Sequence, residues 1–84
     1  MHFYFITFRS VTYAQRAEKL LTHRGYRVSL RRTPRWMEEQ GCGYALKLWS
    51  SDILSVVRLL QENKLQLRKV YAQLENGEME EVRL

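Results

Sequence analysis

The sequence predicts an α+β fold, a ferredoxin-like β-α-β-β-α-β sandwich with a four-stranded antiparallel sheet, two helices on one face and a C-terminal hairpin arm. Two segments, near residues 12–24 and 53–63, repeat apolar side chains at helical spacing. Four other segments have the composition or the alternation of strands, and Asn76-Gly77 forms a strong hairpin signal after the last long one. The chain has 84 residues, so we expect a single domain over residues 1–84.

The first strand and helix have the clearest pattern. Residues 2–8 place large apolar groups on both faces, which is typical of a central strand covered on both sides. Ser10 or Thr12 then caps a helix that runs to about Arg24, and Gly25 follows at the position where helix-ending glycines stand. The apolar stripe of this helix consists of Ala14, Ala17, Leu20 and Leu21.

The later elements follow the same two periodicities. In order, they are a half-buried strand over residues 26–31, a loop over 33–43, a strand over 44–49, a helix from Ser50 or Ser51 to about Asn63, a strand over 68–75 and a short edge strand within 78–84. The last of these is acidic enough to discourage pairing with another chain. Asp52 falls in the first turn of the second helix, where a negative charge suits the helix dipole.

Charge is unevenly distributed along a chain whose net charge is +5. Eight of the 14 Lys and Arg residues precede Trp36, against Glu18 as the single acidic residue there. A basic first half suggests an anionic partner such as nucleic acid, a phosphorylated molecule or an acidic protein surface. The alternative is that these charges serve only solubility.

One cysteine excludes an intramolecular disulfide, and His2 and His23 form no zinc-binding spacing with it. We therefore expect no metal site and no cofactor. The apolar start lacks a basic region and is too short for a signal peptide, and no stretch is long enough to span a membrane. A cytoplasmic location is the default expectation.

The loop over residues 33–43 holds the only proline and the only cysteine of the chain. Pro34 favours an extended Thr33, and glycines on both sides of Cys42 leave the thiol without bulky neighbours in sequence. In the predicted topology the first and third strands are antiparallel neighbours. Cys42 should therefore lie near Arg9, Ser10 and the start of the first helix.

A thiolate is stabilised at a helix N-terminus and beside arginine, so this position and Arg35 predict a lowered pKa for Cys42. Glu38 and Glu39 oppose that effect if they turn inward. The competing interpretation is that Cys42 is a small buried residue with no chemical role.

These residues resemble the selenium/sulfur carrier protein-like family of small bacterial proteins, over about residues 4–60. The matching positions are Ile6-Thr7-Phe8-Arg9-Ser10, Ala14, Glu18-Lys19-Leu20-Leu21, Thr33-Pro34-Arg35 and Cys42-Gly43. The resemblance implies a carrier cysteine, Cys42, that holds sulfur or selenium as a persulfide or selenide. It implies binding roles for Arg9, Ser10, Thr33, Arg35 and Gly43. The chain departs from the family at Arg31 and Arg32, where apolar residues or proline are usual, and at Glu38 and Glu39, where small hydroxyl residues are common.

Two functions follow as hypotheses. In the first, Cys42 accepts sulfur or selenium from a donor such as a cysteine desulfurase and delivers it to an acceptor protein. With no histidine partner and no second cysteine, we expect a carrier rather than an autonomous enzyme.

In the second hypothesis, the chain is a binding module that uses the outward sheet face for dimerisation or for single-stranded nucleic acid. That face should carry Arg27, Ser29, Arg31, Lys47, Trp49, Tyr71 and one of Phe3 or Phe5. An exposed Trp49 and Tyr71 predict a homodimer. Nucleic acid is the less favoured partner, because the RNA-recognition consensus is absent.

Overall fold

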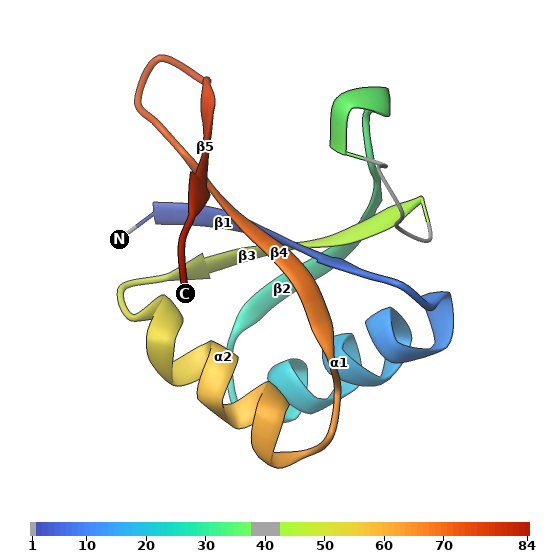
Figure 1. Cartoon of the computed structure of the whole chain (residues 1–84). Coiled ribbons are helices and arrows are strands. Elements are labelled where there is room, and N and C mark those ends of the chain that lie inside the picture. The colour runs from blue at the N-terminus through green and yellow to red at the C-terminus, as the bar shows by residue number, and fades with distance from the viewer. Residues whose placement is uncertain (1, 38–42) are drawn as a thin grey trace.

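The computed structural model describes residues 2–37 and 43–84. The elements are, in order, β1 (His2–Phe8), α1 (Val11–His23), β2 (Arg27–Arg32), the short 3₁₀ helix η1 (Arg35–Met37), β3 (Tyr44–Ser50), α2 (Ile53–Glu62), β4 (Leu67–Gln73) and β5 (Met79–Val82). Both helices lie on the same side of the sheet, and η1 stands on the opposite side (Figure 1).

The sheet is antiparallel throughout, with the strand order β2-β3-β1-β4-β5. The α+β class, the two helices and the central place of the first strand are as predicted. The predicted number of four strands is wrong, because β5 pairs with β4 as a fifth strand, from Val70↔Val82 to Gln73↔Met79. The turn explains this: Leu74 N donates to Glu78 O at 2.7 Å, so the hairpin ladder continues out of the Asn76-Gly77 turn.

Both helices begin at a side-chain cap. Ser10 Oγ accepts a hydrogen bond from Thr12 N at 3.1 Å, so Ser10 is the N-cap of α1. For α2 the cap is Asp52 rather than the predicted Ser50 or Ser51, and its carboxylate accepts from Ser55 N at 3.2 Å. Hydrogen bonds from the Ser55 side chain and backbone hold the pKa of Asp52 below its ordinary value.

The core lies between the helices and one face of the sheet. Alternate strand residues point toward the helices, as the period-two pattern predicted. The fully buried large side chains there are Phe8, Ile6, Leu21, Leu46, Leu48, Leu60, Val56 and Val70. Half-buried Tyr26, Val28 and Leu30 pack against this cluster, which confirms the predicted inner face of the second strand.

A β-bulge interrupts the pairing of β1 with β4. Ile6 pairs with Val70 but Phe8 pairs with Leu67, so two residues of β4 stand opposite Thr7. Thr7 is buried, and its Oγ1 accepts from Lys69 N at 3.1 Å and lies 3.4 Å from Lys69 O, to which it donates. The Thr7 hydroxyl therefore satisfies the backbone groups that the bulge takes out of the ladder.

We expect Thr7→Val to lower the free energy of unfolding by about 1–3 kcal/mol, because valine keeps the shape but leaves Lys69 N buried without a partner. Urea unfolding measures this loss. Thr22→Val, at an exposed position of α1, is the matched control and should change stability by only a few tenths of a kcal/mol. Equal stability of the two variants would show that the Thr7 hydroxyl does not support the bulge.

Candidate functional site

Thr33 and Gly43, which lie on either side of Cys42 in the sequence, are joined by a hydrogen bond at the end of the β2–β3 ladder. Thr33 N donates to Gly43 O at 3.0 Å, one step beyond the last β2–β3 pair, Arg32↔Tyr44. Gly43 has φ +84, a left-handed conformation that a side chain would strain. The chain thus leaves β2 and re-enters β3 at one point, and glycine is required there.

The predicted site residues that the structure describes follow β1, follow β2 or directly precede β3. Cys42, with Glu38 and Glu39, lies outside the described residues. Arg9 and Ser10 directly follow β1. Since β1 pairs with β3 up to Thr7↔Ala45, the end of β1 and the start of β3 lie at the same end of the sheet.

Thr33 and Arg35 belong to the connection that follows β2. Arg35 begins η1, which lies on the face of the sheet opposite α1, whereas Ser10 caps α1 on the helical side (Figure 1). The structure therefore places Arg35 and Ser10 at the same end of the sheet but on opposite faces. The connection with Thr33 and Gly43 lies at the edge between them.

Thr33 carries a buried hydroxyl that no described residue satisfies. Its side chain is 9% exposed, and its Oγ1 has no hydrogen-bond partner among residues 2–37 and 43–84. An unpaired buried hydroxyl lowers the free energy of unfolding by about 1–3 kcal/mol, so such groups are uncommon in folded proteins. This one lies at the base of the connection that carries Cys42.

The start of this connection covers part of the outward sheet face. Met37 is 3% exposed and packs against Ala45 and Tyr71, with Phe5 beside them. The Trp36 ring meets the Tyr71 ring edge-on, with centroids 5.3 Å apart. Tyr71 is therefore buried, and the expectation that it is exposed for dimerisation is wrong. A Trp-Met pair directly after Thr-Pro-Arg was the feature in the sequence that could have indicated this cover.

The rest of the outward face is as the alternation predicted. Arg27 pairs with Trp49, which pairs in turn with Phe3, so the three share one face of the sheet. The rings of Phe3 and Trp49 lie 4.4 Å apart, and Lys47 Nζ stands 4.3 Å from the centre of the Phe3 ring. Trp49 is half-buried in this cluster rather than freely exposed.

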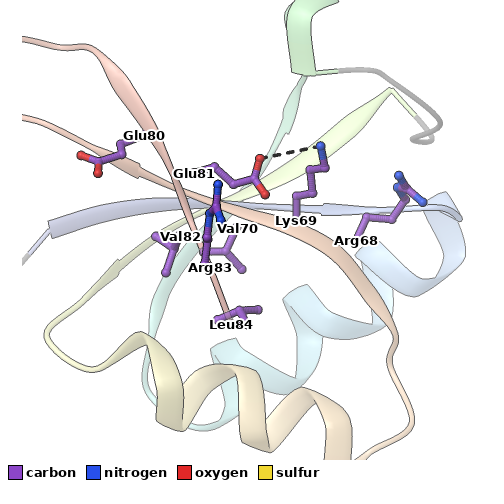
Figure 2. Close-up of a pocket in the computed structure, with 8 residues that line it drawn as sticks. All are labelled: Arg68, Lys69, Val70, Glu80, Glu81, Val82, Arg83 and Leu84. Carbon is purple, nitrogen blue, oxygen red and sulfur yellow. Dashed lines mark ion pairs between the residues drawn. The ribbon is translucent and has the colours of Figure 1, made fainter.

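One open hollow of the described surface involves none of the predicted site residues. It has a volume of about 680 Å³ and is lined by Arg68, Lys69, Val70, Glu80, Glu81, Val82, Arg83 and Leu84. Figure 2 shows these residues along β4 and the C-terminal strand, with Lys69 Nζ 3.7 Å from Glu81 Oε1. Acidic and basic side chains alternate here, so this hollow presents no single charge to a ligand.

Within the described ranges, no three His, Cys, Asp or Glu side chains come together as a possible metal site. The helices in the same ranges are too short or too polar for one of them to cross a membrane.

Comparison with known proteins identifies a family. A model of the family described as "Putative Se/S carrier protein-like" matches residues 3–72, most of the chain. No curated protein and no solved structure matches this chain. The matched range contains the whole connection between β2 and β3, the end of β1 and the start of α1.

We expect Met37→Ala to lower the free energy of unfolding by about 2 kcal/mol or more, because it empties the space between η1 and the sheet. Leu54→Ala is the control, since Leu54 is 59% exposed on α2 and its truncation should cost little. Urea unfolding compares the two variants. A loss no larger than that of the control would mean that Met37 does not anchor η1.

Proposed function

We propose, because this chain belongs to the Se/S carrier protein-like family, that it carries one sulfur or selenium atom on the Cys42 thiol and passes it between partner proteins. The donor is a protein such as a cysteine desulfurase, and the acceptor is a second protein with a nucleophilic group. The observation that carries the proposal is the closed base of the Cys42 connection, where Thr33 N meets Gly43 O at 3.0 Å.

This base favours a carrier for a geometric reason. Cys42 directly precedes Gly43, whose carbonyl accepts the Thr33 hydrogen bond, so the neighbour of Cys42 in the sequence is held at the end of the β2–β3 ladder. The unsatisfied Thr33 hydroxyl lies at the same base and supplies a donor for an anionic sulfur. A carrier needs its thiol positioned for two successive partners, and it needs no further catalytic groups.

The proposed sulfur transfer needs no external oxidant or reductant. The Cys42 thiolate attacks the outer sulfur of a persulfide on the donor cysteine, the donor's S–S bond breaks, and the donor cysteine leaves as a thiolate. Cys42 then holds the sulfur as its own persulfide. In delivery, the acceptor nucleophile attacks the outer sulfur and Cys42 leaves as a thiolate. A selenium atom would follow the same route through a sulfur–selenium bond.

The surrounding charges set how much thiolate is present. Arg9 and Arg35 stand at this end of the sheet and favour the anionic form, which lowers a thiol pKa. Glu38 and Glu39, which lie outside the described residues, oppose this effect if they turn inward. A reduced thiol of this kind needs a reducing compartment, so we place the carrier in the cytoplasm.

We expect Cys42 to react with iodoacetamide with a pKa below the free value of about 8.5, and Arg35→Ala to raise that pKa and slow labelling near neutral pH. The measurement is the labelling rate against pH. Arg58→Ala, which removes an exposed charge from α2, is the control and should leave the profile unchanged. A wild-type pKa at or above the free value would mean a buried structural cysteine and would remove the chemical basis of the carrier.

The same thiol should load sulfur. Incubation with a cysteine desulfurase and cysteine should raise the intact mass by one sulfur atom in the wild type. Reduction with a thiol reagent should reverse this gain. Cys42→Ser should keep the fold, seen by circular dichroism, but gain no mass. Loading of the Cys42→Ser protein would place the carried atom elsewhere.

The alternative function is a binding module, which the outward sheet face favours. Arg27, Arg31 and Lys47 lie there beside the Phe3 and Trp49 rings. The one ion pair among the described residues joins Lys69 and Glu81, so these three cations have no carboxylate partner within that part of the chain. Unpaired cations next to aromatic rings suit a single-stranded nucleic acid, and the Phe3–Trp49 pair also suits a second copy of the chain.

If this face binds a single-stranded oligonucleotide, affinity should fall steeply as salt rises, and Lys47→Gln should weaken it more than Arg58→Gln on the helical side. Fluorescence anisotropy measures both effects. Light scattering of the same samples at micromolar concentration reports whether the protein is a dimer. A monomer that binds no oligonucleotide at low salt would exclude both uses of the face.

A further inference from the structure

A second hollow lies on the helical side of the sheet, where β1 ends. It has a volume of about 460 Å³ and is lined by Arg9, Tyr13, Gln61, Gln66, Leu67 and Arg68. These residues come from the start of α1, the end of α2 and the start of β4. The pair Phe8↔Leu67 holds these parts together, because Arg9 follows Phe8 and Gln66 precedes Leu67 in the antiparallel ladder.

The β-bulge explains why Leu67 lines this hollow on the helical side. In a regular strand Leu67 and Lys69 would share a face. Here Leu67 packs against the core between sheet and helices, whereas Lys69 pairs with Glu81. The extra residue opposite Thr7 produces this change, and bulges commonly re-aim side chains in this way. Figure 2 shows Arg68 directed away from Glu81.

The charges of the hollow are uncompensated. Its lining contains two arginines and no Asp or Glu. The only ion pair among the described residues is Lys69–Glu81, so neither Arg9 nor Arg68 has a carboxylate partner in that part of the protein. Two guanidinium groups around one hollow repel each other unless an anion lies between them. The other polar groups, the Tyr13 hydroxyl and the Gln61 and Gln66 amides, can all donate hydrogen bonds.

We propose that this hollow binds a phosphate-like oxyanion, either free or as the phosphate group of a small phosphate ester. Guanidinium groups match the oxygens of phosphate in pairs, and a dianion suits two of them better than a carboxylate does. The volume exceeds that of a phosphate ion, and half-buried Leu67 and Tyr13 offer apolar surface to the organic part of an ester. The inference does not depend on Cys42 or on the proposed carrier function.

The test is calorimetric titration of the full chain at pH 7.5 and low salt, with inorganic phosphate and with glycerol 3-phosphate. Sodium chloride at matched ionic strength is the reference. Wild type should bind phosphate saturably, with one site per chain. Arg68→Gln should weaken binding about tenfold, as expected for the loss of one charge-assisted pair. Arg24→Gln removes the same charge from the exposed C-terminal end of α1, away from the hollow, and should bind as wild type does.

Melting temperatures without phosphate check that each variant is folded. If Arg68→Gln does not fold, Arg9→Gln tests the same hollow from the exposed end of β1. Tighter binding of glycerol 3-phosphate than of phosphate identifies an ester as the ligand, and equal binding identifies the free anion. No saturable binding by the wild type, or equal weakening by Arg68→Gln and Arg24→Gln, would overturn the proposal.

Discussion

The antiparallel pairing of β1 on both of its edges is the constraint on which the rest of the structure depends. With β3 on one side and β4 on the other, β1 has no free edge, and it is buried by the helices beneath Ile6 and Phe8. Its C-terminal end is therefore a fixed point. The connection that carries Cys42 returns to the sheet beside it through β3, and the hollow with Arg68 forms beside it through β4.

Both candidate sites occur where regular strand pairing stops. On the β3 side, Gly43 takes a positive φ and the ladder ends at its hydrogen bond with Thr33. On the β4 side, the bulge at Thr7 turns Leu67 toward the helical side, out of the regular alternation. A regular ladder uses its backbone groups for pairing and alternates its side chains strictly, so it leaves little freedom to direct polar groups at one place. The irregularities supply that freedom, and the buried centre of the sheet supports them.

The structure also divides the basic first half of the chain among separate surfaces. Arg27 and Arg31 lie on the outward sheet face, Arg35 starts η1 at the end of the sheet, and Arg9 lines the hollow on the helical side. A count of charges along the sequence suggests one anionic partner, but these groups face in different directions. Each surface therefore carries its own positive charge, and a separate experiment can test the role of each surface.

The sequence by itself determined the order of the elements, the inner faces of the strands and the shared face of Lys47 and Trp49, because these depend on local periodicity. It also narrowed the cap of α1 to Ser10 or Thr12 and the aromatic partner on the outward face to Phe3 or Phe5. It predicted the C-terminal hairpin but did not count its edge strand as a fifth strand of the sheet, and it did not reveal the burial of Tyr71 under Met37 or the inward turn of Leu67. The last two depend on contacts between distant segments: a 3₁₀ turn folded onto the sheet and a one-residue shift in register. Such contacts are decided by packing across the whole fold, which no local pattern encodes.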